Sequence, residues 1–107
     1  ETGIFVQKNK PYKIVRFSKN ELNRIMEIYS QKIAIGEWKD YSICFQRNYA
    51  VFCIHKSFYI SPEFEILKYN YDFSRYTLSR KNKIIVKSYS LSKILQRLKK
   101  PALMLVK

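Results

Sequence analysis

The sequence predicts an α+β fold: an antiparallel β-sheet of about five or six strands, with an early amphipathic helix and a C-terminal helix. Three observations support this prediction. Runs rich in β-branched and aromatic residues fill the middle of the chain. Only two glycines interrupt the 107 residues, and apolar residues recur at helical spacing near both ends. The predicted order of elements is β-α-β-β-β-β-β-α.

The length of the chain sets its domain organisation. Residues 11–107 are predicted to form one domain, because a chain of this size buries roughly two-thirds of its unfolded surface. Residues 1–10 are expected to be a flexible leader that ends at Pro11. No apolar run approaches the ~20 residues that span a bilayer, so no membrane contact is predicted.

A short strand and the first helix are expected at the start of the domain. Polar and apolar residues alternate over 12–17, which predicts the strand. Ser18 and Glu21 have the S-x-x-E spacing of a capping box, which predicts that a helix begins there and ends at Gly36. Lys32 is expected on its solvent side. The predicted buried stripe of this helix consists of Leu22, Ile25, Met26, Tyr29 and Ile33.

The stretch 36–58 predicts a β-hairpin around a polar break at Gln46–Tyr49. A turn centred on Arg47 and Asn48 would place Ile43 opposite Phe52. A one-residue slip would scatter the apolar residues over both faces, so the pattern sets the register. Trp38 is expected to fill an edge of the core. The predicted apolar face of this hairpin consists of Tyr41, Ile43, Phe45, Ala50, Phe52 and Ile54.

The same register separates the two cysteines. Cys44 would face Val51 and Cys53 would face Ser42, so the two sulfurs would lie diagonally across the hairpin. Reduced thiols are therefore predicted in preference to a disulfide, and reduced thiols indicate a cytoplasmic protein.

More strands are expected after the central hairpin. The residues 64–69 predict one strand. The residues 76–79 and 84–87 predict a second hairpin with Arg80–Lys83 as its turn.

Ser90 is predicted to cap a last helix. Residues 102–106 are apolar throughout, which predicts a core strand or packed tail, with a homodimer seam as the alternative. The predicted buried face of the last helix consists of Leu91, Ile94, Leu95 and Leu98.

Catalytic chemistry is not predicted. His55 is the sole histidine, and a structural role on its strand is more frequent than general-base catalysis. The spacing of Cys44, Cys53 and His55 matches no standard zinc site and lacks a fourth ligand. The sequence has no glycine-rich phosphate loop. We therefore expect no enzyme activity, no cofactor and no metal.

Charge is the strongest signal for function. The net charge is +13, and no acidic residue follows Asp72. A polyanionic partner explains this bias, although a solvated basic surface is the simpler alternative. The sequence thus predicts a DNA-binding protein, most plainly a transcriptional regulator that binds double-stranded DNA. The residues expected to contact nucleic acid are Arg75, Arg80, Lys81, Lys83, Lys87, Lys93, Arg97, Lys99 and Lys100.

Two other functions fit the same charge. The first is an RNA-binding module, because Tyr71, Tyr76 and Tyr89 lie among the basic residues and tyrosine rings can stack on bases. Tyrosines at the rim of a core are nevertheless more frequent. The second is a basic protein-interaction or secreted effector domain whose charge serves an acidic partner or a membrane surface.

Three segments carry a resemblance to a known family. Phe17 to Leu22 read F-S-K-N-E-L, Gly36 to Tyr41 read G-E-W-K-D-Y, and Ala50 to Phe52 read A-V-F. These segments resemble a small alphaproteobacterial family of unknown function with the pattern G-E-W-[RK]-D-Y, over about residues 12–106.

The composition, rich in Lys, Ile, Asn and Tyr, is typical of an AT-rich genome such as those of the Rickettsiales. In size and charge the chain looks like the small basic DNA-binding expression regulators of Anaplasma and Ehrlichia. That resemblance implies promoter binding, and it assigns no catalytic or base-reading residue.

Overall fold

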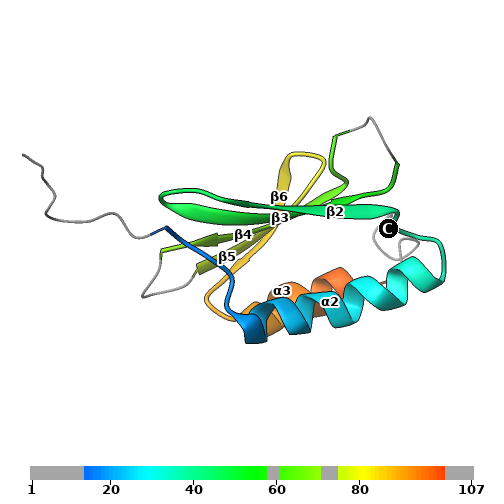
Figure 1. The fold of residues 1–107 in the computed structure, drawn as a ribbon, viewed down its shortest axis with the longest axis horizontal. Helices are drawn as coiled ribbons and strands as arrows, with labels where there is room; N and C mark the ends of the chain where they lie inside the picture. The colour runs from blue at the N-terminus through cyan, green and yellow to red at the C-terminus, as the bar shows by residue number, and fades with distance from the viewer. Residues whose placement is uncertain (1–13, 58–60, 71–74, 101–107) are drawn as a thin grey trace, which may run out of the picture.

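The computed structural model describes residues 14–57, 61–70 and 75–100 of the chain. In these residues the order is a helix, five strands and a helix, so the predicted α+β class is confirmed. The strands form one antiparallel sheet in which each strand pairs with the next, and both helices lie side by side on one face of it (Figure 1). The elements are α2 (Lys19–Ala34), β2 (Asp40–Phe45), β3 (Tyr49–His55), β4 (Phe64–Tyr69), β5 (Arg75–Arg80), β6 (Lys83–Ser88) and α3 (Leu91–Lys99).

The strand expected over 12–17 is not formed in its described part. Residues 14–17 have no regular secondary structure. Val15 and Phe17 are nevertheless buried, and the Val15 N–H donates to the Gln46 carbonyl at 3.2 Å. The alternation that suggested a strand therefore reflects packing of this segment against the core, without the ladder of hydrogen bonds that makes a strand.

Both ends of α2 are specified by sequence. The Ser18 hydroxyl accepts from the Glu21 N–H at 3.1 Å, and the Glu21 carboxylate accepts from the Ser18 N–H at 2.6 Å, which is the predicted capping box. At the other end Gly36 has a φ of 78° and donates to the Ile33 carbonyl at 3.0 Å. A left-handed residue in this position terminates a helix and favours glycine, as predicted.

The buried face of α2 is rotated from the predicted stripe at its last turn. Ile28 and Lys32 are buried, whereas Ile33 is 36% exposed. The Lys32 ammonium lies 2.9 Å from the Glu37 carboxylate and 5.9 Å from the centre of the Trp38 ring. These partners allow the apolar stem of the lysine to be buried, so the prediction that Lys32 faces solvent was wrong.

The register predicted for the central hairpin is confirmed. Ile43 pairs with Phe52, and Phe45 pairs with Ala50. Phe52 and Ala50 are fully buried, and Trp38 is buried at the edge of the core as expected. Phe45 points to the same side but is 41% exposed, because it ends β2.

The second half of the sheet follows the prediction closely. The bounds of β4 are those predicted. Strands β5 and β6 are longer than expected, because Lys81 and Asn82 alone form the turn, with φ values of 51° and 68°. Two residues with positive φ are typical of the type I′ turn that connects tight hairpins.

The last helix buries the four predicted apolar residues. Its start differs from the prediction, because the Ser90 side chain accepts no hydrogen bond from the helix. The Ser90 N–H instead donates to the Ser88 hydroxyl at 2.9 Å. The leader and the apolar segment 102–106, with its homodimer alternative, lie outside the described residues.

A buried charged cluster joins α2 to the sheet. Besides the helix cap, the Glu21 carboxylate accepts hydrogen bonds from the Lys68 ammonium of β4 at 2.8 Å and from the Tyr76 hydroxyl of β5. Lys68 also donates to the Arg16 carbonyl at 2.8 Å. Burial raises the pKa of Glu21, but the hydrogen bonds from Lys68, Tyr76 and Ser18 outweigh it and hold the pKa below its ordinary value.

The core and the register can be tested together by substitution. Phe52→Ala should lower the free energy of unfolding by about 3–5 kcal/mol, because a fully buried ring leaves a cavity. Cys53→Ser should cost much less, since Cys53 lies on the other sheet face and is only partly buried. Urea denaturation of both variants would measure this, and equal losses would contradict the assigned faces.

The cluster around Glu21 predicts a second stability effect. Lys68→Met should lower the free energy of unfolding by about 3–5 kcal/mol, because it leaves the Glu21 carboxylate buried without its cation. Adding Glu21→Gln should recover much of the loss, since glutamine can still cap the helix and no buried charge remains. Chemical denaturation of the single and double variants gives the comparison. A double variant as unstable as the single one would contradict the charge argument.

Acid should weaken the same cluster. Because the folded pKa of Glu21 is depressed, its contribution is complete above the unfolded pKa of about 4.3 and is lost as pH falls through the folded pKa. The free energy of unfolding should therefore decrease below about pH 4.3. The decrease should be shallower in the variant that carries both Glu21→Gln and Lys68→Met. Identical pH profiles would show that Glu21 carries none of the acid sensitivity.

Candidate functional site

The nine basic residues predicted to contact nucleic acid lie on four parts of the molecule. Most of them lie at the β5–β6 turn or on α3. Lys87 lies near the end of β6, on the sheet face opposite the helices. Arg75 begins β5 and is a full strand length from the turn, roughly 16 Å at the usual rise per residue. The predicted set is therefore not one continuous patch.

The β5–β6 turn is attached to the loop before β4. Arg80 donates to the Glu63 carboxylate at 2.8 Å, and its guanidinium lies 5.5 Å from the centre of the Phe64 ring. The Lys81 N–H donates to the Glu63 carbonyl at 3.0 Å. No acidic residue follows Asp72 in the sequence, but the fold brings Glu63 next to this turn. Arg80 is consequently a structural residue, half-buried and paired.

The C-terminal end of α3 meets the turn at one end of the molecule. A small hollow is lined by Arg80 from β5, by Leu98 and Lys100 at the end of α3, and by Lys56 after β3. The sequence did not predict Lys56 as part of the site, because only the sheet topology brings it next to residues of the last third of the chain.

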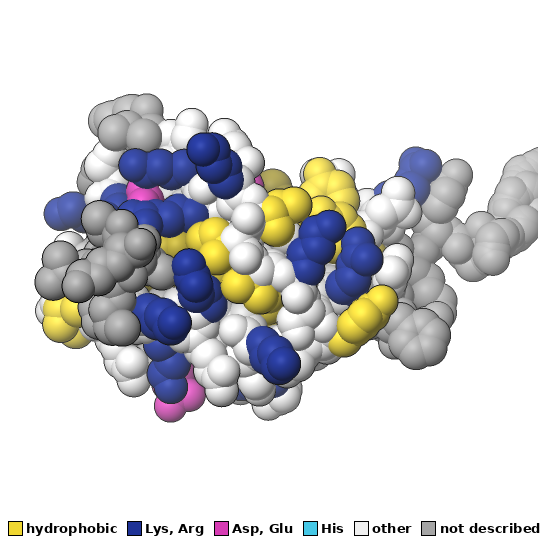
Figure 2. Space-filling model, turned by 180° about the vertical axis from the view of Figure 1, so that it is seen from behind, with side chains coloured by type: hydrophobic (Ala, Val, Ile, Leu, Met, Phe, Trp, Pro, Cys, Tyr) yellow, Lys and Arg dark blue, Asp and Glu magenta, His cyan; other side chains and the backbone are white. Residues whose placement is uncertain are grey.

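Four exposed lysines lie on these two elements, and of these Lys100 lines the hollow. Lys81 and Lys83 lie at the turn, with Lys83 opposite Arg80, and Lys99 and Lys100 lie at the end of α3. We call Lys81, Lys83, Lys99 and Lys100 the basic end. Figure 2 shows Lys and Arg side chains spread over the α3 and β6 side of the molecule, with few acidic side chains among them.

The remaining predicted residues of α3 differ in exposure. Lys93 is exposed. Arg97 is half-buried, and its Nε is buried without a hydrogen-bond partner among the described residues. Arg97 is therefore held partly against the protein surface and is a weaker candidate for a phosphate contact than the lysines beside it.

The tyrosines considered for base stacking fall into different environments. Tyr76 is buried against Glu21 and cannot meet a ligand. Tyr89 is 74% exposed directly after β6, and Tyr71 lies outside the described residues. Sequence reasoning missed Tyr49 and Tyr69, which pair across β3 and β4 with ring centres 6.1 Å apart.

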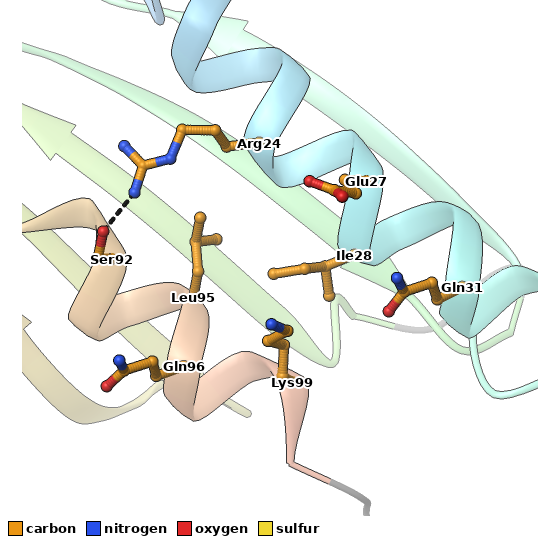
Figure 3. A pocket seen from close by; sticks show the side chains of 8 residues that line it. All are labelled: Arg24, Glu27, Ile28, Gln31, Ser92, Leu95, Gln96 and Lys99. Atoms are coloured by element: carbon orange, nitrogen blue, oxygen red, sulfur yellow. Dashed lines mark hydrogen bonds between the residues drawn. The ribbon is translucent and has the colours of Figure 1, made fainter.

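A groove of about 290 Å³ runs between the two helices on the side away from the sheet. Ile28 and Leu95 form its floor, and Arg24 of α2 donates across it to the Ser92 hydroxyl of α3 (Figure 3). Glu27, Gln31, Gln96 and Lys99 form its polar walls. The groove presents charges of both signs and no convergent set of groups for catalysis.

The structure gives no geometry for metal or nucleophile chemistry in its described part. No cluster of three potential metal-ligating side chains occurs there. His55 lies 3.4 Å from the Ser42 hydroxyl on a strand. Cys44 and Cys53 are both free, and burial raises the pKa of the Cys53 thiol. Neither described helix is long and apolar enough to cross a membrane.

Comparison with known proteins identifies the family. The family model described as protein of unknown function (DUF2794) matches residues 15–99, which run from the segment before α2 to the end of α3. No curated protein and no solved structure matches the chain significantly. The predicted resemblance to a family of unknown function is thus confirmed at the level of the family. The chain belongs to the DUF2794 family, whose function is unknown.

Proposed function

We propose that this protein binds double-stranded DNA through its basic end and acts as a transcriptional regulator. The observation that carries the proposal is the meeting of the β5–β6 turn with the end of α3, which gathers exposed lysines from two separate elements. The resemblance in size and charge to the small regulators of Anaplasma and Ehrlichia favours the same function.

The ion pairs near the basic end support this proposal. Glu63 is engaged by Arg80, and Glu37 is engaged by the buried Lys32. These two acidic side chains therefore form ion pairs with cations that face inward. The outward-facing lysines are then available to bind an external polyanion. Closely spaced phosphates, as in DNA, are the natural binding partner of such lysines.

The shapes of the two elements fit duplex DNA. A two-stranded ribbon and a helix are both narrow enough to enter the major groove. The tight turn at Lys81 and Asn82 gives β5–β6 a narrow tip, while β5 stays paired with β4 along its length, and Lys100 after α3 lies beside Arg80. Lysines on both elements would contact phosphates on the rims of the groove, which position a protein without reading sequence.

The salt dependence of binding tests this proposal. Each lysine that neutralises a phosphate contributes about −0.9 to the slope of log affinity against log salt concentration. Lys81→Gln with Lys83→Gln should therefore flatten the slope by up to about two units, and Lys99→Gln with Lys100→Gln should do the same. Fluorescence anisotropy with a labelled DNA duplex at several salt concentrations would measure the slopes.

The matched control removes equal charge elsewhere. Arg16 and Lys19 are exposed near the start of α2, at the other end of this helix from Lys32, which contacts the Lys100 carbonyl. Arg16→Gln with Lys19→Gln should change the slope little if the phosphate contacts are local. Equal flattening in all three double variants would mean that only net charge matters, and the assignment of the basic end would then be abandoned.

A further inference from the structure

A row of aromatic and basic side chains crosses the sheet at the end opposite the basic end. Tyr49 of β3 pairs with Tyr69 of β4, and Tyr69 pairs with Arg75 of β5. The two rings lie 6.1 Å apart, and the Arg75 guanidinium lies 5.9 Å from the centre of the Tyr69 ring. We call Tyr49, Tyr69 and Arg75 the stacking row.

The stacking row lies on the sheet face that α2 and α3 do not cover. The neighbours in sequence are Ala50, Lys68 and Tyr76, all of which are buried on the helix side, and Lys68 and Tyr76 bond to Glu21 of α2. Because side chains alternate along a strand, the stacking row points the other way. Tyr49 is 37% exposed, Tyr69 is half-buried and Arg75 is exposed, so a ligand can reach both ends of this row.

Two further side chains extend the row toward β6. Lys87 is exposed, lies opposite Thr77 and shares the face of the stacking row. Tyr89 is 74% exposed and directly follows Ser88, the residue that pairs with Tyr76. Three rings and two cations therefore lie between β3 and the residue that follows β6.

We infer that the stacking row binds the unpaired bases of single-stranded DNA. Exposed aromatic rings and guanidinium planes on a sheet stack on bases, while neighbouring cations contact phosphates. Bases inside a duplex have their faces covered by their neighbours, so only a single strand can use such a row. The choice of DNA over RNA rests on the proposed function, whereas the stacking site itself rests on the geometry of the row.

The chemistry of this row separates it from the basic end. The basic end carries exposed lysines and no exposed ring among its four residues, which suits phosphates alone. In the stacking row the π-faces supply binding that does not depend on charge. The usual alternative is that Tyr49 and Tyr69 only stabilise the sheet as a cross-strand pair.

The first test compares ligands on the unmodified protein. Fluorescence anisotropy should show that a labelled oligo(dT) of about 12 nucleotides binds more tightly than an abasic strand with the same number of phosphates. Equal affinity for the abasic strand would overturn the inference, because binding would then need no base. Tighter binding of oligo(U) than of oligo(dT) would overturn the assignment to DNA.

The second test compares variants of the row. Tyr49→Leu should weaken oligo(dT) binding about 5- to 150-fold, which is the usual contribution of one stacked base. Tyr49→Phe keeps the ring and should retain the affinity. Arg75→Gln should weaken binding, while Lys39→Gln, which removes the same charge far from the row, should not.

Failure of this inference and failure of the proposed function give different results. Tyr49→Leu should leave the affinity for duplex DNA unchanged. The variants of the basic end should lower the affinity for duplex DNA, and they should change the ratio of oligo(dT) affinity to abasic-strand affinity much less. Unchanged oligo(dT) affinity in Tyr49→Leu, with an unchanged melting temperature, would show that the ring is not used in binding. A lowered melting temperature with unchanged affinity would assign Tyr49 and Tyr69 to the sheet alone.

Discussion

The fold depends on one carboxylate. Glu21 caps the first turn of α2 and, from the same side chain, accepts hydrogen bonds from Lys68 on β4 and Tyr76 on β5. A buried carboxylate without such partners would cost several kcal/mol, so the helix, β4 and β5 must adopt this arrangement together. The start of α2 is thereby fixed against the middle of the sheet, while Trp38 and the Lys32–Glu37 pair fix its end. This attachment holds α2 against one sheet face, where α3 lies beside it, and neither described helix covers the other face (Figure 1).

The sequence contained most of the fold because short-range chemistry specifies it. The capping box at Ser18, the glycine at 36 and the alternation around Phe52 each predict their element correctly, since each depends only on neighbouring residues. The errors occur where tertiary partners decide. Lys32 is buried because its ammonium pairs with Glu37 and lies over the Trp38 ring. Val15 packs against the core without forming a strand. A single sequence does not reveal such partners.

In the candidate site, too, the sequence could not reveal which side chains have tertiary partners. Charge counting correctly located the excess of basic residues after Asp72, but it could not distinguish Arg80, which is paired with Glu63, from Lys81, which is exposed. It also missed Lys56, and it proposed Tyr76 for stacking although Tyr76 belongs to the core. The register of β3, β4 and β5 is what aligns Tyr49, Tyr69 and Arg75, and spacing along the chain does not predict an alignment across three strands.

The ion pairs formed by buried and half-buried cations determine which side chains carry the net charge of the protein. Lys68 with Glu21, Lys32 with Glu37 and Arg80 with Glu63 are neutral pairs that include buried or half-buried cations. Because each pair has no net charge, the whole excess of +13 is carried by the other side chains. A surface with that excess repels a second copy of itself and attracts polyanions from a distance. Attraction of this kind selects no particular nucleic acid, so in the proposed function selectivity comes from shape, through the narrow β5–β6 turn and the row of rings on the sheet face away from the helices.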